Sequence, residues 1–264
     1  DLERLLESYD EHTARLQSLL SYGVASILLV ASLYDSFSLS EGPHLAELIS
    51  GAYYDLSLSS VPDIVRASSG TQALELLSER SFDLVIAVAQ VGDMSASRFG
   101  QAAKSIRPEL PVYLVAYSAL ELREQQAGPE GIPGIDRAFL WRGDVRLFLT
   151  IIKLLEDERN AAHDSDSAGV RVIVLVEDSP AFYSSYLPML LTELVRQTSS
   201  LIAEEVNVGQ RMLRRRLRPK VLLATSYEEG WRLYERYRSY VLCVISDVQY
   251  PRAGSEDPEA GLRL

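Results

Sequence analysis

The sequence predicts an α/β protein that contains two parallel sheets, each with helices on both faces. Short apolar runs alternate with helix-forming stretches along most of the chain, which is typical of doubly wound sheets. The alternation starts again near residue 170, and residues 70–77 match residues 226–233 in position and character. Two of the predicted strands end in carboxylates, which indicates a site at the carboxyl edge of a sheet.

The composition is typical of a globular protein in a reducing compartment. The 264 residues are 47% hydrophobic and 24% charged, which is enough for two domains. No apolar run approaches the roughly 20 residues that span a bilayer, so we expect no membrane segment and a cytoplasmic location. The net charge of −11 argues against nucleic acid as a partner, because phosphate backbones require clustered cations. The basic run at 211–220 is more typical of a solvated helix end. Cys243, the single cysteine, excludes an intrachain disulfide and is expected to be a buried, inert thiol.

Residues 1–22 are predicted to form an amphipathic helix that ends at Gly23. Its leucines recur at spacings of three and four residues. Such a helix must cover its apolar stripe, either against its own domain, which we favour, or against a second chain, so a homodimer stays open. The chain starts at Asp1 with no leader, and we expect it to be part of a longer protein.

Residues 23–160 are predicted to form the first domain. Strands are expected at 27–31, 64–67, 84–87, 112–115 and 138–140, and helices at 44–54, 70–80, 96–106, 120–125 and 145–159. These alternations make one doubly wound domain. The acidic, polar stretch at 156–169 predicts a helix end that passes into a linker at 161–169.

Residues 170–264 are predicted to begin a second copy of the same fold. Strands are expected at 172–176, 221–224 and 241–246, with a helix at 226–237. The helical stretch at 181–218 is unusually long, since a crossover commonly needs only about a dozen residues. Its apolar face fits a packed insert and an extra docking surface equally well.

Three carboxylates stand at the ends of two of these strands. Glu177 and Asp178 follow the first strand of the second unit, and Asp247 follows the third. Because neighbouring parallel strands end at one edge of a sheet, we expect the three acids to share a pocket. Like charges this close repel unless a cation lies between them, and oxygen ligands suit Mg²⁺. The alternative is that these acids only cap helices, as Asp178 or Ser179 would do ahead of Pro180.

These residues resemble the acidic site of response-regulator receiver domains. In that family, strand one ends in two acids and strand three ends in the phosphorylated aspartate of an Asp-x-x-x-Pro turn, which Glu177, Asp178, Asp247 and Pro251 match. The resemblance implies flavodoxin-like sheets of strand order 2-1-3-4-5, the second truncated after strand three. It also implies that Asp247 accepts a phosphoryl group from a histidine kinase or phosphotransfer protein. Mg²⁺ would be bound by Glu177, Asp178, Asp247 and the backbone carbonyl of Gln249.

The resemblance implies that the first unit is a pseudo-receiver. Its first strand ends in Ala31 and Ser32 where the acids should stand, and its third strand ends in Val88 where the acceptor should stand. Ala116 takes the place of the hydroxyl residue, and Arg142 with Gly143 replaces the Lys-Pro pair. A valine cannot be phosphorylated, so we expect this unit to act through its surfaces. Asp35 lies too far along the loop to be a good substitute ligand.

A closer resemblance is to the amino-terminal tandem-receiver region of bacterial phosphoenolpyruvate synthase or pyruvate phosphate dikinase-like proteins. Similar segments lie at 31–37, 176–179, 217–224, 245–248 and 257–262. This implies an enzymatic domain downstream of Leu264, whereas the chain itself is expected to be regulatory and not an enzyme. The favoured interpretation is a phosphorelay receiver module. The alternatives are a non-catalytic dimerisation or docking module and a docking cap that regulates an attached enzyme.

Overall fold

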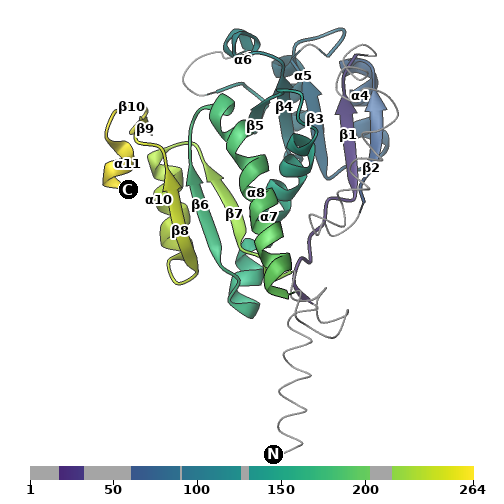
Figure 1. Cartoon of the computed structure of the whole chain (residues 1–264). Coiled ribbons are helices and arrows are strands. Elements are labelled where there is room, and N and C mark those ends of the chain that lie inside the picture. Colours follow the sequence, from purple (N-terminus) through teal and green to yellow (C-terminus); the bar gives the residue numbers. More distant parts are fainter. Residues whose placement is uncertain (1–17, 33–60, 90, 126–130, 203–215) are drawn as a thin grey trace, which may run out of the picture.

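The computed structural model describes residues 18–32, 61–89, 91–125, 131–202 and 216–264 (Figure 1). The helix predicted at 44–54 and Asp35 lie outside these residues, as do residues 1–17 of the predicted first helix. Residues 19–22, which are described, belong to no helix. Among the described helices, none is long and apolar enough to cross a membrane.

The first sheet confirms the predicted order of five parallel strands, β2-β1-β3-β4-β5. Every residue of β3 and β4 is buried, because helices cover both faces of the sheet. Ser69 and Ser95 cap α4 and α5 through their side chains. The elements are β1 (Ser26–Val30), β2 (Asp63–Ala67), α4 (Gly70–Glu79), β3 (Leu84–Val88), α5 (Ala96–Ile106), β4 (Val112–Ala116), α6 (Ala119–Gln125) and β5 (Arg137–Leu140).

The second sheet contains three parallel strands in the order β7-β6-β8, which corresponds to strands 2-1-3 of the first sheet. It is built from β6 (Val172–Val176), α8 (Pro180–Ile202), β7 (Lys220–Ala224), α10 (Tyr227–Tyr237) and β8 (Val241–Ser246). An antiparallel hairpin of β9 (Tyr250–Arg252) and β10 (Ser255–Asp257) follows, with the short helix α11 (Ala260–Arg263). No sequence pattern predicted this hairpin, although Tyr250 is completely buried in it.

The prediction of a linker at 161–169 was wrong. These residues are the last turns of helix α7 (Arg146–Ala168), which ends at Gly169 in the left-handed conformation. Asp157 and Asp164 of the stretch at 156–169 are buried, whereas Asp166 is exposed: Asp157 pairs with Arg218 at 2.6 Å, and Asp164 pairs with Lys220 at 2.7 Å. The basic run that was expected to decorate a solvated helix end therefore supplies two buried cations to α7.

Helices α7 and α8 lie between the two sheets and join them (Figure 1). One hydrophobic core contains residues of β1, β3 and α7 together with Leu175, Tyr183 and Leu187 of the second unit. The Asn160 side chain of α7 also binds the backbone N–H and carbonyl of Tyr22, at 2.9 and 2.8 Å, just before β1. Of the helix predicted at 181–218, the structure describes α8 as far as Ile202; residues 203–215 lie outside the described residues, and residues 216–218 form a turn.

Strand β8 is the outermost strand of the second sheet as described. Its side chains Leu242, Val244 and Ile245 are exposed. Cys243 is exposed as well, so the expectation of a buried thiol was wrong. The reason is that no described residue pairs with the outer edge of β8, whereas the equivalent strand β3 pairs with β4.

Candidate functional site

The three predicted carboxylates come together at the carboxyl edge of the second sheet. Strands β6 and β8 pair so that Val176 lies opposite Ser246, and the next residues, Glu177 and Asp247, leave the sheet side by side. The Glu177 N–H donates to the carbonyl of Ala224 at 3.0 Å, and the Asp247 N–H donates to that of Val176 at 3.0 Å. Carboxylate oxygens of Glu177, Asp178 and Asp247 then all lie within 4.8 Å of one another.

The three acids differ in their exposure to solvent. Glu177 is only 4% exposed, and its Oε1 accepts the N–H of Ser179 at 3.0 Å. Asp178 is half-buried, and Asp247 is exposed, with its Oδ1 accepting the N–H of Val248 at 2.7 Å. The cluster therefore has a closed side at Glu177 and an open side at Asp247, where a larger molecule can approach.

Burial and mutual repulsion both act on the ionisation of this cluster. Burial raises the pKa of Glu177, and the charges of Asp247 and Asp178 add to that increase. Burial likewise raises the pKa of Asp178, with further repulsion from Glu256 and Asp247. A cation among the oxygens would remove this repulsion, and a set of carboxylate oxygens is the donor set that Mg²⁺ prefers. The residues present therefore fit a divalent cation.

The loop that carries Asp247 is held by the hairpin and by α11. The Ser246 hydroxyl donates to the Asp247 carbonyl at 2.7 Å, and the hydroxyls of Ser246 and Tyr250 are hydrogen-bonded to each other at 3.0 Å. The Gly261 N–H donates to the carbonyl of Val248 at 2.9 Å, and a Cβ at Gly261 would lie only 1.9 Å from the Asp247 carbonyl oxygen. The sequence did not predict these roles of Tyr250 and Gly261, although Tyr250 lies in the Asp-x-x-x-Pro turn and Gly261 lies in the segment 257–262.

Gln249, the fourth predicted ligand, lies in the exposed loop between β8 and β9, two residues after Asp247. Its contribution would come from the backbone carbonyl and not from the side chain. This carbonyl stays a predicted ligand.

The carboxyl edge of the first sheet has the same backbone geometry without the acids. The Ala31 N–H donates to the carbonyl of Ala67 at 3.0 Å, as that of Glu177 does to Ala224. Val30 lies opposite Ala87, so Val88 occupies the place that Asp247 has in the second sheet. Ala116 at the end of β4 is fully buried. Within the described part of the chain, the only acidic group that could hold a metal is the one in the second unit.

The two units also repeat the turn between the second strand and the following helix. The cap serines Ser69 and Ser226 each accept the N–H of the residue three positions later, Gln72 or Glu229. The side chains of Gln72 and Glu229 in turn each accept the backbone N–H ahead of the cap, at 2.8 Å. Ser69 and Ser226 are therefore structurally equivalent. The sequence match of 70–77 with 226–233 is shifted from this structural alignment by one residue.

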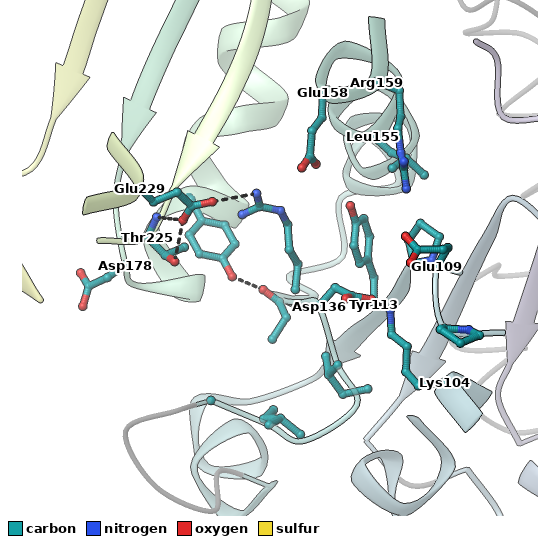
Figure 2. Close-up of a pocket in the computed structure, with 18 of the residues that line it drawn as sticks. Lys104, Glu109, Tyr113, Asp136, Leu155, Glu158, Arg159, Asp178, Thr225 and Glu229 are labelled. Carbon is teal, nitrogen blue, oxygen red and sulfur yellow. Dashed lines mark hydrogen bonds and ion pairs between the residues drawn. The ribbon is translucent and has the colours of Figure 1, made fainter. Parts of the chain in front are cut away.

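A cavity of about 630 Å³ lies beside the acid cluster, between the two units. Figure 2 shows Asp178 and Glu229 at one end of this cavity and Lys104 and Glu109 at the other. Arg137 of β5 also lines it. The cavity therefore extends from Asp178 of the cluster to the starts of β4 and β5, at the amino-terminal edge of the first sheet.

No protein-family model matches this chain, and no curated protein matches it. Among solved structures, it is similar to the signal receiver domain of an HD domain-containing protein from Pseudomonas fluorescens Pf-5. The identity is 19%, the match covers 54% of this chain and 94% of that chain, and the TM-score is 0.36.

Proposed function

We propose that this chain is a phosphorelay module of the response-regulator type, in which Asp247 accepts a phosphoryl group with the help of bound Mg²⁺. The observation that carries the proposal is the convergence of Glu177, Asp178 and Asp247 within 4.8 Å at the ends of β6 and β8. The ligands of the cation would be these three side chains and the Gln249 carbonyl. The donor would be a phosphohistidine of a histidine kinase or phosphotransfer protein.

The arrangement of the three acids suits transfer to Asp247 in particular. An ionised oxygen of Asp247 attacks phosphorus, the phosphorus–nitrogen bond of the donor breaks, and the released imidazole takes up a proton. Asp247 is the exposed member of the cluster and can meet a protein donor, whereas Glu177 is buried behind it. When bound, Mg²⁺ would neutralise the acids and stabilise charge on the phosphoryl oxygens.

The first unit would serve as a pseudo-receiver that acts through its surfaces. Its support is the placement of Ala31 and Val88 where the second unit has Glu177 and Asp247. The proposal also expects the receiver's hydroxyl and lysine residues on two further strands beside β8. The exposed apolar side chains along the outer edge of β8 fit such a cover, since parallel sheets are normally buried on both faces.

A second candidate function is a non-catalytic dimerisation or docking module that regulates an attached phosphoenolpyruvate synthase-like enzyme. The observation that favours it is a stripe on α8 formed by Phe182, Tyr186 and Met189, each about half exposed. The rings of Phe182 and Tyr186 stack with their centres 6.1 Å apart. An exposed apolar stripe of this kind is typical of a protein contact.

Phosphoryl uptake separates the two candidates. The natural protein is incubated with acetyl phosphate and Mg²⁺, and its mass is measured with the Asp247→Asn variant and a Glu235→Gln control on α10. The proposal predicts that wild type and control gain one phosphoryl group and that Asp247→Asn gains none. Absence of uptake by the wild type would favour the docking module, and uptake by Asp247→Asn would move the acceptor elsewhere.

A further inference from the structure

Arg137 belongs to the first unit but extends to the second. It is the first residue of β5, and its side chain is 13% exposed. Its Nη2 donates to the carbonyl of Leu223 at 3.1 Å and lies 3.4 Å from Oε1 of Glu229. Burial opposes the charge of Arg137, but Glu229 holds the pKa of this guanidinium above its ordinary value. The end of β7 and the start of α10 are therefore attached to the first sheet.

Glu229 transmits this attachment to the turn between β7 and α10. Its Oε2 accepts both the N–H and the hydroxyl of Thr225, at 2.8 and 3.2 Å. In the first unit the neutral Gln72 makes the same two bonds to Ser68, so the turn itself does not require a charged side chain. The charge that distinguishes Glu229 from Gln72 is used in the contact with Arg137.

This turn supports the backbone of the acid cluster. Ala224, the residue just before Thr225, accepts the N–H of Glu177 at 3.0 Å. Among the described strands, β7 is the outer one on its side of the second sheet, so its last residues pair with β6 alone. Arg137, Thr225 and Asp178 also line the same cavity. The position of Glu177 therefore depends on a turn that the first unit holds in place.

We propose that Arg137 is a positioning residue for the site at Glu177, Asp178 and Asp247. The inference rests on the proposed function of that site and extends it, because it gives the first unit a part in phosphoryl transfer although that unit has no acceptor. Arg137 touches neither the cation nor the phosphoryl group. It fixes the end of β7 and thereby the buried carboxylate of Glu177.

Removing Arg137 should change Mg²⁺ binding in opposite directions, depending on whether this residue acts through its contacts or through its charge alone. A cation beside the cluster repels Mg²⁺, so loss of its charge alone would tighten Mg²⁺ binding. Loss of its two contacts, by contrast, would release the turn at Thr225, misplace Glu177 and weaken Mg²⁺ binding. The sign of the change therefore separates positioning from a long-range effect of charge.

The test compares Arg137→Ala, Arg137→Lys and a control, Arg80→Ala, which removes the exposed ion pair between Arg80 and Asp63 at 3.1 Å. Amide hydrogen exchange is measured without Mg²⁺ over residues 172–180 and 222–230, and the Mg²⁺ dissociation constant is then measured by calorimetry. In Arg137→Ala we expect faster exchange in both segments and several-fold weaker Mg²⁺ binding. Arg137→Lys should resemble Arg137→Ala more than wild type, because an ammonium lacks the planar fork of guanidinium. Arg80→Ala should match wild type.

Each contrary result is decisive. Unchanged exchange around Glu177 and Thr225, or tighter Mg²⁺ binding in Arg137→Ala, would overturn the role of Arg137. Faster exchange spread evenly over both sheets would also overturn it, because it would show only a general loss of stability. If the wild type binds no Mg²⁺, the proposed function fails, but the exchange measurement still decides whether Arg137 positions Glu177.

Discussion

The substitution Asp247→Asn should stabilise the protein when no divalent cation is present. Asparagine keeps an oxygen that can accept the Val248 N–H, which Asp247 now binds at 2.7 Å. It removes one of three charges whose oxygens lie within 4.8 Å of one another. The substitution therefore removes repulsion within the cluster and keeps the hydrogen bond that holds the loop.

The size of the effect follows from the distances between the carboxylates. Two unit charges 4.8 Å apart in water-like surroundings repel by about 0.9 kcal/mol. Asp247 takes part in two such pairs, with Glu177 and Asp178, and physiological salt screens part of the repulsion because Asp247 is exposed. We expect Asp247→Asn to raise the free energy of unfolding by about 1 kcal/mol in EDTA.

Urea unfolding followed by tryptophan fluorescence measures this difference, with Glu235→Gln as the matched loss of an exposed carboxylate outside the cluster. At a free Mg²⁺ concentration of about 100 times the dissociation constant, wild type should gain about 2.7 kcal/mol. The variant should gain much less, so the order of stabilities reverses. Lower stability of Asp247→Asn in EDTA, or an equal gain from Mg²⁺ in both proteins, would refute the argument.

Three further predictions concern pH, the buried ion pairs and the loop of the cluster. The folded-state pKa values of Glu177 and Asp178 are raised. Their contribution to stability is therefore fully present below the ordinary carboxyl pKa and is lost as the pH rises through the folded pKa values. The free energy of unfolding, measured against pH, should show this loss in EDTA and not in saturating Mg²⁺. Arg218→Ala leaves a buried carboxylate of α7 without its partner, and urea unfolding should show a loss of about 3–5 kcal/mol; a loss under 1 kcal/mol would contradict the burial of this pair. Gly261→Ala drives a Cβ against the Asp247 carbonyl, and calorimetry should show about tenfold weaker Mg²⁺ binding, whereas unchanged affinity would mean that α11 does not hold the loop.

Much of the fold and the three acids of the site could be predicted from local patterns. Strands β6 and β8 begin and end where the sequence predicts, at 172–176 and 241–246, because each is a continuous apolar run of the kind that parallel strands have, although only β6 is buried among the described residues. The rule that parallel strands end at one edge then brings Glu177, Asp178 and Asp247 together. Their roles as cation ligands and acceptor stay predictions.

Local patterns failed where burial depends on a partner distant in the sequence. Asp157 and Asp164 belong to the acidic stretch that predicted a helix end and a linker, yet each is buried against a cation more than fifty residues away. Cys243 stands in an apolar run and is nevertheless exposed, because the neighbours of a strand decide its burial. The strands of the β9–β10 hairpin are three residues each, too short for a periodic pattern to predict.

The sequence by itself determined the α/β class, the repeat of one fold and the absence of acids at Ala31 and Val88. These properties depend on residue type and on spacing within one element. The tertiary structure alone decided that α7 and α8 join the two sheets and that Arg137 reaches the turn beside Glu177. The physical reason is that a contact between residues 137 and 229 depends on how two packed sheets are placed, and no period within either segment contains that information.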